Sequence, residues 1–511
     1  MTDVSTEPRS NDYEVVVVGG GLGGLSAAAF LAKGGRSVLL VERLDAPGGY
    51  AHSFSRGPYL YDPAVHVIGQ LDDGQMVDTW LNALGVRDRV EFISVEHFYS
   101  VRFPDFTLNV PFGVDEFVEA HAEHFPHEAA GIRSFMDICT QIRDERDVYV
   151  STASSGGELD AERFSTLLRY RSATVGDVLD ATISDPRVKG ALSAIWWYQG
   201  LPPDRLSFLV FAGMLVALCE DRHGHCRGSF QRLVDAYVAA IVENGGEVVV
   251  KQKVARILIE SGAAAGIELE DGSQIHAPIV VSNADATQTF HGLVGPEHVP
   301  DRYLRRLESM RPAVSAFIVY AATTLDIAQF DLAHEVMYYK SWDHRESFEH
   351  ALAGEPWCLA ISVPTLVDPS LAPEGEHLVT AAALTAYDVG RPWSELKDEL
   401  TQGIMREVES LFPGVQAELT FSEGASPLAL HHYSLNRDGA MYGWENSPDQ
   451  SFARRLSNKS PVPGLYLAGA WAQPGSGTVA VMQSGFQTAQ MILGHDSKDA
   501  FLHTLGYAAA T

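Results

Sequence analysis

The hydrophobic pattern is strongest near the start of the chain, where apolar runs alternate with glycine-rich and polar stretches. A polar segment, residues 1–12, precedes the β-branched run YEVVVV at 13–18. The turn GGGLGG follows at once, then a stretch of small apolar residues up to Gly34 and Gly35, then the apolar run SVLLVE. A continuous β-branched run is typical of a strand covered on both faces of a parallel sheet. The pattern predicts a βαβ unit that ends at Glu42, preceded by a disordered arm.

The middle of the chain has a different pattern. Residues 61–70, YDPAVHVIGQ, form an apolar segment with one histidine, which we interpret as a strand. Residues 99–111 alternate like a hairpin, and helical periodicity dominates from about 113 to 225. The longest apolar run, 206–219, is too short to span the ~30 Å hydrocarbon core of a bilayer. It predicts a buried helix or, as the alternative, a monotopic face that dips into a membrane.

Nucleotide-binding patterns return twice further along. Residues 228–285 have the pattern of a helix, two strands, a hairpin turned at Asp271-Gly272 and a final apolar strand. Residues 464–493 have the pattern of a strand, a glycine-rich turn and a helix. Similar signatures at both ends, with other material between them, predict one domain that is assembled from distant segments.

Charge and cysteine content narrow the classes of partner. The chain has 37 basic and 66 acidic residues, a formal net charge of −29 at pH 7. This charge repels nucleic-acid phosphates, so we expect no nucleic-acid partner. The polar start of the chain lacks the basic and apolar regions of a signal peptide. The four cysteines show no CxxC spacing. We expect free thiols and a cytoplasmic protein, with peripheral contact at the inner membrane face as an alternative.

Three glycines, Gly19, Gly21 and Gly24, match the dinucleotide-binding spacing GxGxxG. The first permits the tight turn, the second lets the backbone approach a pyrophosphate, and the third lets the helix pack closely on the strand. The helix that begins here directs free N–H groups and its positive dipole end at the phosphates. Glu42 ends the next strand at the distance needed to accept hydrogen bonds from ribose hydroxyls, and its charge disfavours a 2′-phosphate. FAD or NAD is therefore favoured over NADP.

Two further turns extend this site. Gly48 and Gly49, in DAPGG, let the backbone fold back toward the pyrophosphate and ribityl chain of a longer cofactor, with an ordinary turn as the alternative. Gly469 and Ala470 end an apolar strand, and PGSGTV then leads into a helix whose N-terminus can meet the flavin ring or ribityl oxygens. Together these features predict one extended cofactor, FAD, held from both ends of the chain.

The predicted fold class is α/β, with a Rossmann-like FAD-binding domain assembled from both chain ends and an inserted α+β substrate or cap domain. Its expected division is a disordered arm (1–12), the first part of the FAD-binding domain (13–70), a cap with a helical insertion (71–227), the second part of the FAD-binding domain (228–295), the second part of the substrate domain (296–445), the last part of the FAD-binding domain (446–495) and a C-terminal tail (496–511).

These segments resemble the phytoene desaturase, carotenoid isomerase and retinol saturase family of FAD-dependent oxidoreductases, in the amine-oxidase-like flavoprotein superfamily. The resemblance extends from about residue 13 to 493 and is carried by VVVGGGLGGLSAAAFLAKGG, VERLDAPGG, GGEVVVKQKVARI, VVSNAD, VPTLVDPSLAPEGEH, GAMYGWE and PVPGLYLAGAWAQPGSG. It implies that Val254 offers backbone hydrogen bonds to the adenine and that Gly469 and Ala470 lie at the diphosphate and ribityl chain. It also implies that Thr478 and Val479 present backbone near the pyrimidine edge of the flavin.

The motif and the resemblance together give the expected cofactor-binding residues: Gly19, Gly21, Leu22, Gly23, Gly24, Glu42, Arg43, Gly48, Gly49, Tyr50, Ser53, Val254, Asn283, Gly469, Ala470, Thr478 and Val479. Two departures leave the subgroup open. Many phytoene desaturases carry Arg where this chain has Tyr50, and their DAGP segment is DPAVHVIG here. Both departures are nearer to the retinol saturase pattern.

Candidate catalytic residues are few, because no Ser-His-Asp order, zinc spacing, Walker loop or paired-carboxylate motif stands out. We expect no metal, and we expect Asp62, Arg102 and Glu220 to be structural or surface charges. His66 is the candidate for a donor or proton acceptor beside the flavin or substrate. The alternative is a buried, hydrogen-bonded structural histidine.

Three other histidines, His52, His431 and His432, compete with His66 for that role. All of the family's reactions need an apolar slot, for which we expect the 206–219 run and the aromatic cluster Trp196, Trp197 and Tyr198. Simple core packing is the alternative for the cluster, and aromatic rings also stabilise a polyene cation.

The expected function is that of an FAD-dependent oxidoreductase acting on carbon–carbon bonds of a lipophilic, carotenoid-like polyene. Either a hydride passes to flavin N5 in desaturation, or the flavin supports cis–trans isomerisation; retinol-saturase-like reduction runs hydride transfer the other way. One alternative is a flavin-dependent dehydrogenase, isomerase or aromatase of a polyene acyl chain in secondary metabolism, with an acyl carrier protein as partner. Another is a non-catalytic flavin-binding assembly protein. The oligomeric state stays open.

Overall fold

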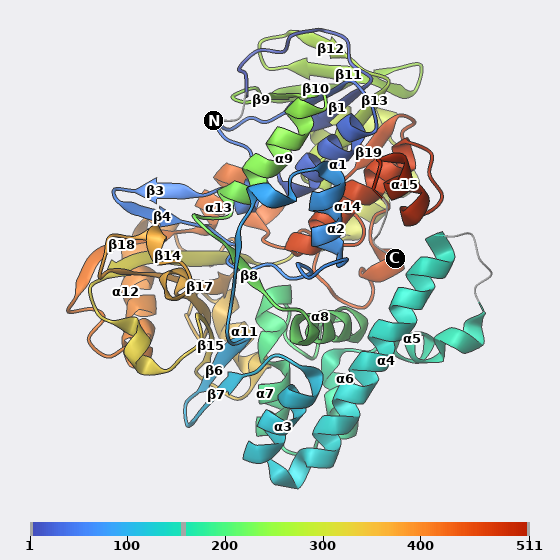
Figure 1. The fold of residues 1–511 in the computed structure, drawn as a ribbon. Coiled ribbons are helices and arrows are strands. Elements are labelled where there is room, and N and C mark those ends of the chain that lie inside the picture. Colours follow the sequence, from blue (N-terminus) through green and yellow to red (C-terminus); the bar gives the residue numbers. More distant parts are fainter. Residues whose placement is uncertain (1–3, 155–159, 508–511) are drawn as a thin grey trace.

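Both ends of the chain contribute strands to one parallel sheet in the computed structural model, which describes residues 4–154 and 160–507 (Figure 1). The strand order is β19-β13-β1-β2-β9. The strands are β1 (Val15–Val18), β2 (Val38–Val41), β9 (Glu247–Val249), β13 (Ile279–Ser282) and β19 (Leu465–Leu467). In register, Val15 lies opposite Val38 of β2 and Ile279 of β13. The α/β fold class predicted from the two ends of the chain is confirmed.

The β-branched run of β1 is explained by its two covered faces. Val15 and Val17 pack against the helices α1 (Leu22–Lys33), α9 (Gln231–Glu243) and α14 (Thr478–Ile492). Val16 and Val18 pack against the antiparallel sheet of β10 (Val254–Glu260), β11 (Ala263–Leu269) and β12 (Gln274–His276). Successive side chains of a strand point to opposite faces, so a strand covered on both sides is apolar throughout.

A seven-stranded mixed sheet forms the second large unit, in the order β18-β14-β17-β16-β15-β6-β7. Its strands are β6 (Tyr99–Phe103), β7 (Phe106–Val110), β14 (Ser315–Thr323), β15 (Glu335–Tyr339), β16 (Cys358–Ser362), β17 (His377–Thr385) and β18 (Leu419–Ala425). Helix α12 (Trp393–Leu411) covers one face. The other face packs against the helical cap.

Six helices form the cap below the parallel sheet in Figure 1. They are α3 (Val114–His124), α4 (Ala129–Ser154), α5 (Ser165–Tyr170), α6 (Val175–Thr182), α7 (Pro186–Ser193) and α8 (Phe208–Glu220). Most side chains of α8 are buried, which confirms the buried helix predicted over 206–219. Within 4–154 and 160–507, no helix combines the length and the apolar character needed to cross a bilayer.

The remaining elements connect these layers. They are α2 (Met76–Leu84), α10 (Asp301–Ser309), α11 (His344–Leu352), α13 (Pro427–Ser434), α15 (Lys498–Thr504), the hairpin of β3 (Phe54–Arg56) and β4 (Tyr59–Tyr61), and the pair of β5 (Phe92–Ser94) and β8 (Gly224–Cys226). Although α2 falls within 71–227, its Trp80 stacks on Phe486 of α14 with ring centroids 5.7 Å apart. This helix therefore shares the core of the parallel sheet and not that of the cap.

The N-terminal segment differs from its prediction. Residues 4–12, the described part of the expected disordered arm, pair with the edge of the parallel sheet at Ser5 and with β12 at Asn11 and Asp12. Ser5 N–H donates to the carbonyl of Val248 at 3.1 Å, and Val250 N–H donates to the carbonyl of Ser5 at 3.0 Å. The prediction is wrong because backbone hydrogen bonds to the edge strand β9 order this segment, and such bonds leave no hydrophobic pattern in a sequence.

Residues 61–70 also differ, since most of this segment is not a strand. Tyr61 ends β4, and beyond it a single bridge joins Ile68 to Gly224, with Ile68 N–H donating to the Gly224 carbonyl at 2.9 Å. Pro63 lacks an N–H donor and so interrupts any ladder at this point. The apolar composition of the segment comes from its position against the cavity described below.

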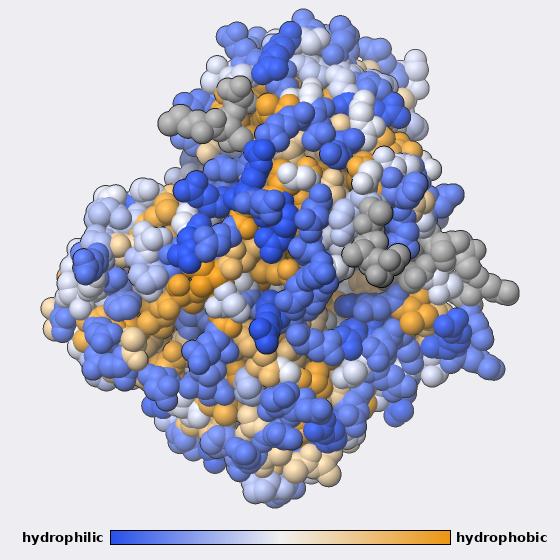
Figure 2. Space-filling model, viewed as in Figure 1, coloured by the Kyte–Doolittle hydropathy of each residue, from blue (hydrophilic) through white to orange (hydrophobic). Residues whose placement is uncertain are grey.

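Hydrophilic residues cover most of the face seen in Figure 2, with apolar residues in patches between them. The chain has 66 acidic and 37 basic residues, which agrees with this hydrophilic face. All four cysteines are free and buried, as their spacing predicted.

Candidate functional site

A cavity of about 1440 Å³ lies between the parallel sheet and the mixed sheet. One wall is formed where parallel strands end, at Val18 and Val41, and by Asn283 and Gly469, which follow β13 and β19. The opposite wall is the cap side of the mixed sheet together with α8. Ligands of open α/β sheets bind beyond the carboxyl ends of the strands. The cavity therefore joins the expected cofactor position to the substrate domain.

The first glycine-rich turn leaves no room for side chains. Gly19 has φ of 97°, in the left-handed region that favours glycine. A Cβ added to Gly24 would lie 2.1 Å from the carbonyl oxygen of Gly19, so α1 packs directly on the end of β1. The first N–H groups of a helix have no partner within it. Gly21, Leu22 and Gly23 line the cavity at this helix end, which suits phosphate.

Glu42 is buried at the end of β2 and fixes two loops. Its Oε2 accepts from Gly20 N–H at 2.8 Å, and its Oε1 accepts from Leu44 N–H at 2.8 Å. Each carboxylate oxygen can accept more than one hydrogen bond, so both remain able to accept from a hydroxyl. Glu42 also lines the cavity. Its contact with a ribose stays a prediction that this geometry supports.

The second glycine pair is packed against the first turn. Gly48 N–H donates to the carbonyl of Gly20 at 2.8 Å, and Gly48 has φ of 134°. A Cβ on Gly49 would lie 3.1 Å from the Cα of Gly21. The DAPGG segment is therefore a wall of the same site. The neighbouring Arg43 lines the cavity as well and donates to the carbonyl of His432.

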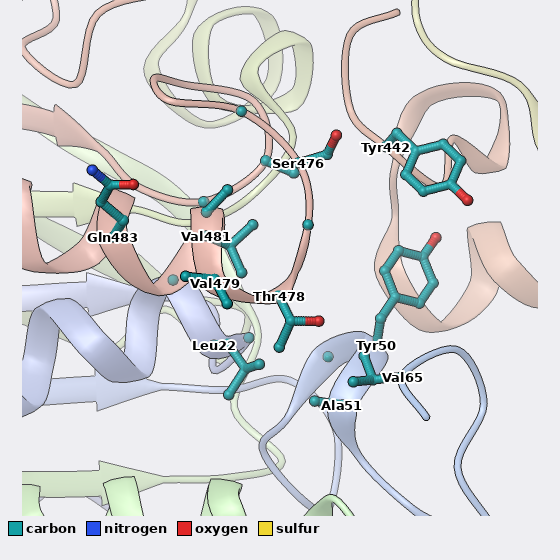
Figure 3. Close-up of a pocket in the computed structure, with 18 of the residues that line it drawn as sticks. Leu22, Tyr50, Ala51, Val65, Tyr442, Ser476, Thr478, Val479, Val481 and Gln483 are labelled. Atoms are coloured by element: carbon teal, nitrogen blue, oxygen red, sulfur yellow. The ribbon is translucent and has the colours of Figure 1, made fainter. Parts of the chain in front are cut away.

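The C-terminal turn closes the site from the other side. A Cβ on Gly485 would lie 2.3 Å from the carbonyl oxygen of Gly23, so α14 packs closely on α1. Ser484 Oγ accepts from Gly469 N–H at 3.0 Å and fixes the end of β19. Figure 3 shows the start of α14, with Thr478, across the cavity from Tyr50 and Tyr442.

The cavity brings together most of the residues predicted to bind the cofactor: Gly19, Gly21, Leu22, Gly23, Glu42, Arg43, Gly48, Gly49, Tyr50, Val254, Asn283, Gly469, Ala470, Thr478 and Val479. Two glycine turns that a Cβ would fill and two helix N-termini at one cavity fit the phosphates and flavin of FAD. Gly24 is not on the wall and serves the site through the packing of α1.

Ser53 lies outside this wall. Its hydroxyl donates to Asp62 Oδ1 at 2.5 Å and accepts from Gln231 N–H at 3.2 Å. Asp62 Oδ1 also accepts from Phe230 N–H at 3.1 Å. These two side chains therefore hold the N-terminus of α9. Burial raises the pKa of Asp62 to about 7, opposed by the hydrogen bonds from Ser53 and Phe230.

The other two charges set aside as structural also have protein partners. Arg102 donates to the Thr107 hydroxyl across the β6–β7 hairpin. Glu220 pairs with Arg143 of α4 and, in addition, lines one end of the cavity.

His66 lines the cavity, and its Nδ1 is buried without a hydrogen-bond partner among the described residues. Its backbone carbonyl accepts from His225 Nδ1 at 2.9 Å. Burial lowers the pKa of His66 to about 4, with a smaller contribution from nearby His225. His66 is therefore neutral at pH 7. Within the described part of the chain, an unpartnered ring nitrogen is shared by buried histidines such as His121 and His344, so the position of His66 on the cavity wall is what makes it a candidate.

The three competing histidines do not line the cavity. His52 Nδ1 lies 2.6 Å from the carbonyl oxygen of Gly49, and His431 Nδ1 lies 2.8 Å from that of Asn436. His432 offers its backbone carbonyl to Arg43. His223, which the sequence did not single out, does line the cavity, and its buried Nε2 has no partner in the described part of the chain.

The cavity wall includes part of the apolar slot that the sequence predicted. Trp197, Tyr198 and α8 residues including Leu209 and Met214 line the cavity. Trp196 is fully buried instead, with its ring centroid 5.9 Å from that of Phe348, and belongs to the core. The aromatic cluster thus divides between the slot and core packing.

Sequence patterns missed the polar part of the mixed sheet. Glu335, Ser362 and Thr380 lie on neighbouring strands and line the cavity. Burial raises the pKa of Glu335 to about 7, and a hydrogen bond from Tyr198 opposes this shift. These residues are distant in sequence, and only the strand register brings them together.

Comparison with known proteins agrees with this geometry. The phytoene desaturase (neurosporene-forming) of Rhodobacter capsulatus is 28% identical over 504 residues, covering 93% of each chain. The prolycopene isomerase of Daucus carota is 27% identical over 97% of this chain and 82% of its own length. The all-trans-retinol 13,14-reductase of Rattus norvegicus is 25% identical over 91% of this chain and 83% of its own length. These relatives, at 25–28% identity, confirm the family resemblance that the motifs predicted.

A solved structure of an oxidoreductase from Methanosarcina mazei shares the fold, with a TM-score of 0.65 and 19% identity over 93% of this chain and 99% of that one. The model of the family of flavin-containing amine oxidoreductases matches residues 22–493. The family implies FAD as the cofactor, as the glycine turns predicted. The chain belongs to the flavin-containing amine oxidoreductase family and is a distant homologue of carotenoid desaturases, carotenoid isomerases and retinol saturase.

Proposed function

We propose that this protein is an FAD-dependent oxidoreductase that acts on carbon–carbon bonds of a lipophilic polyene, by desaturation or by cis–trans isomerisation. The observation that carries the proposal is the single cavity that runs from the glycine turns to the apolar wall of α8 and the mixed sheet. A site of this kind encloses a long apolar ligand beside a cofactor. The relatives' printed names, phytoene desaturase and prolycopene isomerase, support the same substrate class.

The chain's own residues bind and orient the cofactor and the substrate, and they exclude water from the cavity. The two glycine turns and the N-termini of α1 and α14 would hold FAD, which when bound supplies hydride acceptance or donation at its N5. Trp197 and Leu209 give the slot an apolar surface that favours a hydrocarbon chain over water. His66 lines the cavity and is neutral, and its buried Nδ1 has no hydrogen-bond partner among the described residues, so its imidazole can accept or donate a hydrogen bond.

Product analysis tests this proposal. The FAD-loaded protein is incubated with phytoene, lycopene isomers and retinol, once oxidised with a quinone acceptor and once reduced, and the products are separated by chromatography. Putrescine and benzylamine serve as controls for amine oxidation. We expect conversion of at least one polyene and of neither amine. Conversion of the amines alone would overturn the proposal.

A further inference from the structure

Four strands of the mixed sheet carry one polar row across the substrate side of the cavity. In register, Tyr320 of β14 lies opposite Thr380 of β17, Thr380 opposite Ser362 of β16, and Ser362 opposite Glu335 of β15. Glu335, Ser362 and Thr380 line the cavity. Because directly opposite residues on neighbouring strands share a face of the sheet, this row is a continuous polar strip on the cavity wall. We refer to Glu335, Ser362 and Thr380 as the polar row.

The neighbouring row on the same face is apolar. Ala382 and Ala360 lie two residues from the polar row on β17 and β16. Ile318, two residues from Tyr320 on β14, is in register with Ala382, and all three line the cavity. Two residues along a strand correspond to about 7 Å. The wall thus places a smooth apolar surface beside a polar strip, an arrangement suited to a ligand that is apolar along its length and polar at one point.

The polar row has unmet hydrogen-bonding capacity. The Ser362 hydroxyl is buried and has no partner among the described residues, and Ser362 is only 2% exposed. A buried polar atom without a partner costs free energy, so native structures nearly always satisfy it with protein, water or a ligand. Tyr198, from the facing side of the cavity, donates to Glu335. A pure hydrocarbon in the slot would leave the Ser362 hydroxyl unpaired.

The charges around the row indicate a neutral ligand group. The basic residues on the cavity wall are Arg43, Arg143, Arg146, Lys253 and Lys498, none of which belongs to the mixed sheet. Arg143 and Arg146 also pair with acidic side chains. A substrate carboxylate at the polar row would therefore face Glu335 without a cation. A hydroxyl or carbonyl oxygen can bond both to a hydroxyl and to a protonated carboxyl group.

We propose that the polar row recognises a neutral oxygen substituent, so that the preferred substrate is an oxygenated polyene rather than a hydrocarbon carotene. This proposal rests on the proposed function and narrows its substrate class. The polar row acts by binding and positioning the ligand. Sites built to hydrogen-bond a substrate oxygen discriminate strongly against analogues that lack it.

Binding of matched probes to the FAD-loaded protein tests the proposal. The probes are all-trans-retinol, its hydrocarbon counterpart with CH3 in place of CH2OH, and retinoic acid, followed by the quenching of tryptophan fluorescence. We expect retinol to bind at least about tenfold more tightly than the hydrocarbon, the amount that one good hydrogen bond supplies. Retinoic acid should gain no such preference.

Variants identify the residues responsible. Ser362→Ala and Glu335→Leu should each reduce the preference for retinol severalfold, whereas Glu335→Gln, which stays polar and neutral, should keep most of it. Thr385→Val is the matched control, because it removes an equally buried and unpartnered hydroxyl of β17 that does not line the cavity. It should leave the preference unchanged.

The outcomes separate this inference from the proposed function. Equal or tighter binding of the hydrocarbon, together with turnover of hydrocarbon polyenes, would overturn the polar-row inference and leave the proposed function intact. A preference for retinol that survives both Ser362→Ala and Glu335→Leu would also overturn it. Absence of binding by every probe would count against both.

Discussion

His66 is the catalytic residue that we propose for this cavity. It is neutral because burial lowers its pKa to about 4, and its Nδ1 has no hydrogen-bond partner within 4–154 and 160–507. Replacing it with Asn should leave the FAD content unchanged and lower turnover about tenfold or more, in the range of a lost catalytic hydrogen bond or proton transfer. His121→Asn is the control, since His121 is also a buried histidine with a pKa near 4 but lies in α3, outside the cavity.

The turnover rate and the flavin content of both variants are measured to test the role of His66. Equal turnover of His66→Asn and His121→Asn would make His66 a structural residue. Because His66 titrates near pH 4, its own ionisation should not shape the activity profile between about pH 6 and 8.

Glu335 should give the protein a pH-dependent stability. Its pKa in the folded state, about 7, lies above the ordinary value of 4.5 that applies to the unfolded chain. The folded state therefore holds this proton more tightly, and the stabilisation is full below about pH 4.5 and is lost as pH rises through about 7. Glu335→Gln removes this dependence. Denaturant unfolding should show the variant gaining stability relative to the wild type from pH 5 to pH 8.

A constant difference between the two proteins over that range would contradict the assignment. Asp62 also has a raised pKa of about 7, so the Glu335→Gln variant should keep the part of the pH dependence that Asp62 contributes.

The sequence predicts Ser53 as a cofactor-binding residue, and its side chain also has protein partners. It follows the second glycine pair, yet its hydroxyl binds Asp62 and the N-terminus of α9. Ser53→Ala should keep FAD at the wild-type ratio and lower stability by about 1–2 kcal/mol, because it removes a hydrogen bond to buried Asp62 and leaves the Gln231 N–H without its acceptor. Flavin absorbance per protein and denaturant unfolding measure the two effects. Loss of FAD without loss of stability would return Ser53 to the cofactor site.

At the scale of elements, the contact between α1 and β1 makes the cofactor turn possible. Gly24→Ala would place a Cβ 2.1 Å from the carbonyl of Gly19 and push α1 away from the strand. We expect the purified protein to lose most of its bound FAD. The control is Gly403→Ala in α12, where the nearest atom to the new Cβ is 3.6 Å away. That change should keep FAD and stabilise the helix by roughly 0.5–1 kcal/mol.

The ratio of flavin to protein absorbance compares the two variants. Full FAD occupancy in Gly24→Ala would contradict the role given to this contact.

The elements also show what a sequence can and cannot reveal. The glycine spacing and the β-branched runs predicted β1, α1, β2, β19 and α14, because these features depend on neighbours in the chain. The polar row depends on the register of β15, β16 and β17, so nothing local marks Glu335 as part of a site. Residues 61–70, which include His66, follow neither the helical nor the strand periodicity, because this segment is ordered by its contacts and by one bridge.

At the scale of the whole molecule, two sheets enclose one cavity from opposite sides. The parallel sheet supplies glycine turns from residues far apart in the chain, and the mixed sheet supplies the apolar and polar rows. The family and the cofactor follow from the first half of this arrangement. The proposed substrate class rests on the second half. Relatives at about 25–28% identity are named for different reactions.

Anaerobic mixing of the FAD-loaded protein with polyenes tests this account most directly. The flavin absorbance is followed after oxidised protein meets a candidate polyene and after reduced protein meets the same compound, with the products then separated by chromatography. We predict that an oxygenated polyene either changes the flavin absorbance or is isomerised by one of the two forms. A flavin spectrum and a polyene that both stay unchanged across carotenoids, retinoids and polyenoic acids would contradict it.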